Sequence, residues 1–280
     1  MNDNEREFSI HKIERGRVVS CSDQVAVEEP LEIRLVYGPA AQRKIRSLSV
    51  TMRTPGNDFD LAVGFLISEG IVTQPAQIIA QRFAPPFLDG SQSSNVVEIE
   101  LSPDTVFEFS KLQRHFYTTS SCGVCGKASL DAIRADQIRA IQDPVTISAD
   151  IVQQLPDSLS RRQTVFQKTG GLHAAGLVTL QGEWVAVYED VGRHNAVDKL
   201  VGSQVLRGTF PITQRALVLS GRASFELMQK ALLARIPIVV AVGAPSSLAV
   251  ELAREFNLTL IGFASQHRFN VYSAQERVTV

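Results

Sequence analysis

Residues 215–263 decide the fold and read RALVLSGRASFELMQKALLARIPIVVAVGAPSSLAVELAREFNLTLIGF. Three nearly unbroken apolar runs alternate here with two stretches of helical spacing. The apolar runs cover 215–219, 236–242 and 258–263, and the helical stretches cover 224–233 and 247–256. Strands that are apolar on both faces and alternate with helices are typical of a parallel or mostly parallel sheet covered on both sides. The stretch therefore predicts a compact α/β domain.

The same pattern extends upstream and sets the size of this domain. Residues 183–188 read as a further strand, and a helix begins near Asn195. We assign residues 169–280 to the α/β domain.

A smaller α+β domain is predicted over residues 17–115. Residues 29–38 alternate apolar and polar side chains, as a half-buried strand does, and 48–53 read as its partner. Asp58 is a good N-cap for a helix with one apolar face. Further strand-like segments lie at 95–101 and 106–109.

The remaining residues are assigned to an arm and a connection. Residues 1–16 are polar, and we expect a disordered or loosely packed arm. Residues 116–168 hold a cysteine-containing loop, then helical stretches at 128–141 and from Ala149, the second interrupted by Pro156.

Composition argues against several classes of protein. The chain has 280 residues, 44% of them hydrophobic, so a sizeable core can form. With 28 basic and 29 acidic residues, the net charge of −1 argues against a nucleic-acid-binding surface. The N-terminus lacks a signal-peptide core, and the most apolar run, 236–243, is far too short to span a membrane. Three cysteines make no secreted disulfide framework, so we expect a cytoplasmic protein with Cys21 as a small buried hydrophobe.

Polar residues follow each strand of the predicted sheet. The four segments are 189–194, 220–224, 243–247 and 263–268, and all are rich in Gly, Ser, Arg or His. Ligands of open α/β sheets bind beyond the carboxyl ends of the strands, and three of these segments open helices, whose N-termini favour anions. Arg193, Arg222 and Arg268 can pair with phosphate, and Phe263 and Phe269 can stack on a base. The edge predicts a phosphorylated, nucleotide-like ligand.

A structural interpretation of the same edge stays open. Serine at a helix start is commonly a cap, and glycine there is commonly a turn. The chain holds neither a G-x-G-x-x-G fingerprint nor a Walker loop.

Cys122 and Cys125 form a C-x-x-C within the Gly-rich stretch 119–127 and admit four interpretations. Half a zinc site would need two further ligands, and no second C-x-x-C is present. A thioredoxin-like redox pair normally follows a strand and opens a helix. A sulfur carrier needs an accessible thiolate of low pKa, which Lys127 and a following helix N-terminus favour. Two inert cysteines in a turn are the fourth interpretation.

Zinc deaminase chemistry is disfavoured by the segment 169–175. The deaminase signature places a glutamate two residues after its histidine, and Ala175 stands there after His173. His173 is either a satisfied core histidine or a wall of the ligand pocket. We expect no metal site.

Six segments in order resemble the FdhD/NarQ family, the formate dehydrogenase accessory sulfurtransferases. They are MRTPG (52–56), GFLISEG (64–70), SCGVCG (121–126), TGGLHAA (169–175), EDVGRHNAVDK (189–199) and SGRASFELMQK (220–230). The likeness runs over about residues 28–273.

The resemblance implies a sulfurtransferase with a cysteine persulfide intermediate. It implies that sulfur from a cysteine desulfurase is carried on Cys122, assisted by Cys125, to a molybdenum or tungsten bis(molybdopterin guanine dinucleotide) cofactor bound as substrate. The client would be the catalytic subunit of formate dehydrogenase. The family also implies a homodimer and a C-terminal domain of cytidine deaminase-like fold.

The guanine nucleotide moiety of that cofactor is expected at the last loop. The implied contacts are Phe263, Ala264, Ser265, Gln266, His267 and Arg268, and we add Arg222 and His194 from the neighbouring segments. Two other functions stay open: a cofactor-binding chaperone without sulfur transfer, and a thiol oxidoreductase.

Overall fold

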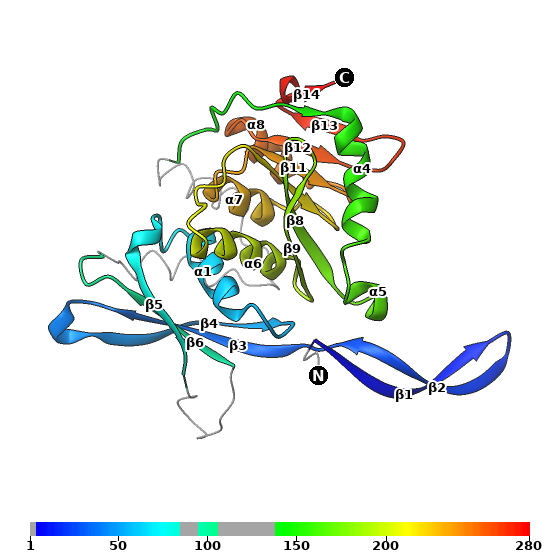
Figure 1. Ribbon diagram of the computed structural model, residues 1–280, viewed down its shortest axis with the longest axis horizontal. Helices are drawn as coiled ribbons and strands as arrows, with labels where there is room; N and C mark the ends of the chain where they lie inside the picture. Colours follow the sequence, from blue (N-terminus) through cyan, green and yellow to red (C-terminus); the bar gives the residue numbers. More distant parts are fainter. Residues whose placement is uncertain (1–3, 85–94, 106–137) are drawn as a thin grey trace.

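A computed structural model describes residues 4–84, 95–105 and 138–280, which form two larger sheets, two two-stranded sheets and the helices packed against them (Figure 1). In this part of the chain, no helix is long and apolar enough to cross a membrane. Cys122, Cys125 and the strand predicted at 106–109 lie outside the described residues, as does nearly all of the helix predicted at 128–141.

The larger sheet has six strands in the order β13-β12-β11-β10-β8-β9. They span β8 (His173–Thr179), β9 (Trp184–Asp190), β10 (Arg215–Leu219), β11 (Ile238–Ala241), β12 (Thr259–Gly262) and β13 (Asn270–Ser273). The α/β class is as predicted, but only β10, β11 and β12 pair in parallel. β8 and β13 are antiparallel to their neighbours, so the expectation of a mostly parallel sheet was wrong at both sides.

Helices cover both faces of this sheet, as its apolar strands require. On one face lie α6 (Arg193–Leu206), α7 (Phe225–Leu233) and α8 (Ser247–Glu255), and on the other lies α4 (Ala149–Ser160) (Figure 1). Alternate residues of β10 serve the two cores: Leu217 joins the α6 and α7 side, whereas Val218 packs with Leu155 of α4. α4 continues through Pro156, so the predicted interruption there does not occur.

The smaller sheet has the strand order β4-β3-β6-β5. Its elements are β3 (Glu29–Tyr37), β4 (Lys44–Arg53), β5 (Ile78–Phe83) and β6 (Val96–Leu101), with α1 (Asp58–Ser68) on one face. The strands predicted from alternation at 29–38, 48–53 and 95–101 are therefore present. The N-cap of α1 is Asn57 in the left-handed conformation, with Asp58 as the first helical residue.

Two glycines let the two parts of the molecule approach closely. A Cβ atom on Gly64 of α1 would lie 1.8 Å from the carbonyl oxygen of Asp198 in α6, and one on Gly202 would lie 1.8 Å from that of Asp60. The helix backbones are thus in direct contact. A single core cluster runs through this contact, from Leu31 of the smaller sheet to Leu217 of the larger.

The N-terminal residues form a hairpin where the sequence predicted a disordered arm. β1 (Glu5–Glu14) pairs with β2 (Arg17–Ala26) over the full length of both strands. The hairpin projects from the body and contacts it near α5 (Phe166–Thr169), where Lys168 meets Glu5 at 2.6 Å (Figure 1). Cys21 lies on this hairpin and is exposed, so its predicted burial was wrong.

The chain is completed by one short parallel pair, β7 (Ile147–Ser148) with β14 (Val278–Thr279). It fixes the C-terminal segment beside the start of α4.

Candidate functional site

Five strand ends meet at one edge of the larger sheet. β9 and β10 both run antiparallel to β8, so they point the same way as β11 and β12. The carboxyl ends of these four strands therefore share an edge with His173, the first residue of β8. This is the arrangement predicted from the polar segments that follow the strands.

Backbone hydrogen bonds join the loops of this edge into one surface. The N–H of Ser220 donates to Ala174 O at 3.0 Å, and the Ala174 N–H donates to Ser220 Oγ at 2.8 Å. Further along, the N–H of Gly243 donates to Gly221 O at 2.9 Å, and the N–H of Phe263 donates to Gly243 O at 3.1 Å. Each loop is held by its neighbour, so the surface is preorganised.

Gly243 allows two of these loops to touch. A Cβ atom there would lie 2.9 Å from the backbone nitrogen of Arg222. The glycine therefore brings the exposed Arg222 against the next loop, with its side chain at the surface.

His173, Arg193 and His194 gather at the β8 and β9 end of the edge. Burial lowers the pKa of His173, the positive charge of Arg193 lowers it further, and Asp190 acts in the opposite direction. Burial, followed by Lys230 and Arg193, lowers the pKa of His194 to about 4. Both imidazoles are thus neutral at physiological pH, and positive charge here comes from arginine.

One polar atom in this group has no partner. The Nε of Arg193 is buried and makes no hydrogen bond within the described residues. A buried N–H without an acceptor is costly, so an anionic oxygen placed there would be favoured.

Glu226, in the first turn of α7, adds a carboxylate near His194. Its Oε2 lies 3.9 Å from His194 Nε2, and Ser224 Oγ lies 3.5 Å from the same nitrogen. Its pKa is lowered: burial opposes the shift, but the hydrogen bonds of its own backbone N–H and of Ser224 outweigh it. Its place at a predicted helix start is the one signal by which sequence analysis could have found Glu226.

The residues of the last loop, 263–268, differ in exposure and in contacts. Phe263 is 44% exposed and adopts a left-handed φ of 52°, whereas Ala264 is buried against the α4 side of the sheet. Ser265 and Arg268 close a turn, since Ser265 N–H and Oγ both donate to Arg268 O. The Gln266 amide donates to the Asp157 carboxylate of α4.

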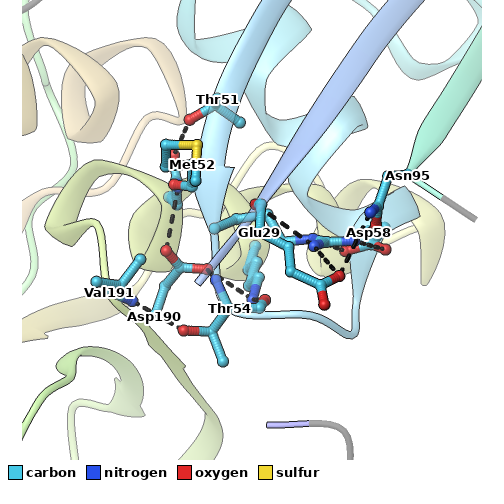
Figure 2. A network of polar contacts seen from close by, with 11 residues as sticks. Glu29, Thr51, Met52, Thr54, Asp58, Asn95, Asp190 and Val191 are labelled. Atoms are coloured by element: carbon cyan, nitrogen blue, oxygen red, sulfur yellow. Dashed lines mark hydrogen bonds and ion pairs between the residues drawn. The ribbon is translucent and has the colours of Figure 1, made fainter. Parts of the chain in front are cut away.

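Asp190 stabilises this edge from the interior of the protein. It is fully buried; its Oδ1 accepts from Gly192 N–H at 2.8 Å, and its Oδ2 lies 2.7 Å from Lys199 Nζ. The same Oδ2 accepts from Thr54 N–H of the smaller sheet at 3.2 Å, and Thr54 Oγ1 accepts from Val191 N–H at 3.1 Å (Figure 2). The loop that presents Arg193 and His194 is thus held partly by the other sheet.

Arg53 and Asn195 extend this network. The Arg53 guanidinium, 1% exposed, makes two 3.0 Å bonds to the Asp58 carboxylate, and Asn195 Nδ2 donates to Met52 O at 2.8 Å (Figure 2). The MRTPG and EDVGRHNAVDK segments are therefore docked on one another.

The structure brings together some of the predicted site residues and separates others. His194, Arg222 and Phe263 lie at the shared edge, and His173 is exposed there, so it is not a core histidine. Ala264 is buried, and Gln266 turns toward α4. Their contacts with a ligand, like the roles of Cys122 and Cys125, stay predictions.

The chain is similar in sequence to known proteins over nearly its whole length. The profile of the FdhD/NarQ family matches residues 26–279. The chain belongs to the FdhD/NarQ family. It is 48% identical to the sulfur carrier protein FdhD of Streptomyces avermitilis over 272 residues, which is 96% of this chain and 94% of that protein. It is 44% identical to the protein of the same name from Mycobacterium tuberculosis over 275 residues, covering 96% and 97%.

The FdhD/NarQ fold also has a crystallographic counterpart. A chain from Desulfotalea psychrophila, named for a formate dehydrogenase accessory role, matches with a TM-score of 0.73 at 21% identity. The match covers 98% of this chain and 99% of that one. At this identity it supports the overall fold.

Proposed function

We propose that this protein is a sulfur carrier that serves the maturation of formate dehydrogenase. The observation that carries the proposal is the match to the FdhD/NarQ family over nearly the whole chain, including relatives named sulfur carrier protein at 44–48% identity. The C-x-x-C at Cys122 and Cys125 supplies the thiols that such a role needs.

In the proposed reaction, Cys122 receives sulfur from a cysteine desulfurase. Its thiolate attacks the outer sulfur of the donor persulfide, an S–S bond forms at Cys122 Sγ, and the donor cysteine leaves as a thiolate. This exchange needs no external oxidant, since one S–S bond replaces another. Cys125 assists by relaying the sulfur or resolving the persulfide, and a reducing cytoplasm suits both thiols.

The proposed acceptor is the metal of a bis(molybdopterin guanine dinucleotide) cofactor, bound as substrate at the shared strand edge. Two features of that edge support a phosphorylated ligand: the unpartnered Nε of Arg193 and the loops that open α6, α7 and α8. Phe263 is exposed and offers a ring face to a base. We further propose a homodimer that docks on the catalytic subunit of formate dehydrogenase.

Intact-mass analysis after incubation with a cysteine desulfurase and cysteine tests the sulfur step. We expect one added sulfur, removable by a thiol reductant, on the wild-type protein and on Cys21→Ser, but none on Cys122→Ala. Wild-type protein that gains no sulfur would sink the proposal. Full formate dehydrogenase activity with Cys122→Ala would instead favour a chaperone that binds the cofactor without carrying sulfur.

A further inference from the structure

β9 is the last strand of the six-stranded sheet within the described residues, and its outer edge is open. Ala174 directs its N–H and C=O toward Ser220 of the β10 side, so the neighbouring residues of β8, such as Ala175, direct theirs toward β9. Ala175 lies opposite Tyr188, and Leu177 lies opposite Ala186. Backbone groups of Val187 and Glu189 therefore point away from the sheet, whereas Val185 lies at a β-bulge.

These outward backbone groups have no hydrogen-bond partner in the part of the chain that the structure describes. An open strand edge is a template for pairing with another extended chain. Native proteins commonly cover or charge such an edge when nothing binds there.

A cavity of about 360 Å³ lies along this edge. Residues 185–189 of β9 line it. The other walls come from Asn4 before β1, from Pro55 and Asn57 before α1, from Arg162, Thr164 and Val165 before α5, and from Lys199 and Arg207 of α6 and its C-terminal end. The edge is thus framed by four other segments of the chain. A single extended strand fits this geometry better than a bulky domain does.

The cavity is lined by three basic residues, Arg162, Lys199 and Arg207, and by one carboxylate, Glu189. Lys199 is neutralised by Asp190 at 2.7 Å, and the Glu189 carboxylate accepts from the backbone N–H groups of Val165 and Phe166 at 3.0 and 2.8 Å. Arg162 and Arg207 line the cavity, are exposed, and have no ion pair among the described residues.

Asp60, the nearest other carboxyl group, does not line the cavity. Burial raises its pKa, Tyr188 and Arg207 act in the opposite direction, and its side chain forms hydrogen bonds with Tyr188 and Asn57. The cavity therefore presents net positive charge beside unpaired strand backbone.

We propose that the β9 edge binds an extended acidic segment of a partner protein by strand addition. The backbone of the segment pairs with Val187 and Glu189, and its carboxylates meet Arg162 and Arg207. Because β9 ends in the loop that carries Arg193 and His194, the bound segment lies next to the proposed cofactor edge. The proposal concerns a different surface and does not depend on sulfur transfer.

The single tryptophan of the chain reports on this surface directly. Trp184 is the first residue of β9; its Nε1 donates to Ser158 Oγ at 2.8 Å, and the Arg162 guanidinium lies 5.1 Å from its ring centroid. Titration of the full chain with an acetylated, amidated (Glu-Val)4 peptide should give a saturable change in tryptophan emission. The (Lys-Val)4 and (Glu-Pro)4 peptides should bind at least tenfold more weakly, because they lose the charge match and the backbone donors respectively.

Variants of the protein separate the contribution of charge from that of backbone pairing. Arg207→Glu should weaken (Glu-Val)4 binding at least tenfold, whereas Arg17→Glu, the same charge change on the remote hairpin, should alter it less than twofold. Val187→Pro removes an outward N–H while leaving the β8 pairing intact, since proline is tolerated at such edge positions. It should also weaken binding at least tenfold, with the far-UV circular dichroism unchanged.

Two results would overturn the proposal. One is an emission change that is absent, or equal for (Glu-Val)4 and (Lys-Val)4. The other is a dimer, seen by sedimentation velocity, that Val187→Pro or Arg207→Glu converts to monomer, because a second copy of this chain would then occupy the edge.

Discussion

The guanidinium of Arg193 has one buried nitrogen, Nε, without a partner in the described structure. A ligand phosphate oxygen that accepts from it would recover part of a cost of about 1–3 kcal/mol. We expect Arg193→Met to weaken guanosine diphosphate binding at least tenfold by isothermal titration calorimetry, with Arg268→Ala weakening it as well. Arg6→Met on the remote hairpin serves as control and should bind like wild type. Unchanged affinity in Arg193→Met would remove this arginine from the site.

The depressed pKa of His194 gives a defined pH dependence. The folded protein holds this imidazole neutral down to about pH 4, whereas the unfolded chain takes up the proton near pH 6.5. Between these values the unfolded state binds more protons, so stability falls as pH decreases from about 6.5 to about 4. Urea denaturation across this range should show a shallower fall for His194→Gln than for wild type. Parallel curves for the two proteins would contradict the burial of the neutral imidazole.

Site residues differ in how far the sequence could reveal them. The placement of His194 and Arg222 at one edge was predictable because both follow strands whose carboxyl ends share that edge. Asp190 sits in the same segment, yet it is an internal brace, since burial decides its role and burial is a property of the folded chain. Spacing alone could not choose between Cys122 and Cys125; only the family resemblance did.

At the scale of elements, the α1 and α6 crossing is the tightest contact in the described structure. Gly64→Ala would place a methyl group 1.8 Å from Asp198 O, and relief requires the helices to separate. We expect a loss of about 1–3 kcal/mol or more in the free energy of unfolding, measured by urea denaturation. Gly171→Ala, whose Cβ would meet its nearest atom at 3.5 Å, should change stability by less than about 1 kcal/mol. Equal stabilities of the two variants would refute direct backbone contact.

The elements missed by sequence analysis share a weak local signal. β8 reads HAAGLVT, in which alanine and glycine have low strand propensity; its pairing with β9 and β10 decides its conformation. β1 and β2 are mostly exposed, so they lack the apolar alternation that marks a half-buried strand. Apolar runs predicted β10, β11 and β12 well, but such runs carry no information on strand direction, which is why the antiparallel flanks were not foreseen.

At the scale of the whole molecule, the two sheets share one core. Sequence patterns suggested two modules, because the α+β pattern at 29–101 differs from the α/β pattern after residue 169. The core cluster nevertheless includes Val97 of the smaller sheet with Leu200 and Leu217 of the larger part. Buried polar contacts between Thr54 and Asp190 cross the same boundary. Joint packing of this kind depends on tertiary contacts that local periodicity does not encode.

The buried ion pair at this boundary should contribute far more to stability than an exposed ion pair of the same length. Lys199 meets Asp190 at 2.7 Å with both side chains almost fully buried, and it also donates to Thr54 O at 2.8 Å. Lys12 and Glu14 on the hairpin also lie 2.7 Å apart, but both are exposed. Removing one partner of a buried pair costs about 3–5 kcal/mol, whereas an exposed pair contributes about 0–1 kcal/mol. We therefore expect Lys199→Met to lose far more stability than Lys12→Met in urea denaturation.

Lys199→Met also tests whether the two larger sheets unfold together. Trp184 fluorescence follows the larger sheet, and far-UV circular dichroism follows both. If the shared core makes unfolding cooperative, the two signals will give one midpoint in wild type, and Lys199→Met will shift both by the same amount. Separate midpoints, with only the circular dichroism transition moved by Lys199→Met, would mean that the smaller sheet detaches first. The boundary contacts would then hold the Arg193 loop in place without joining the two sheets into one cooperative unit.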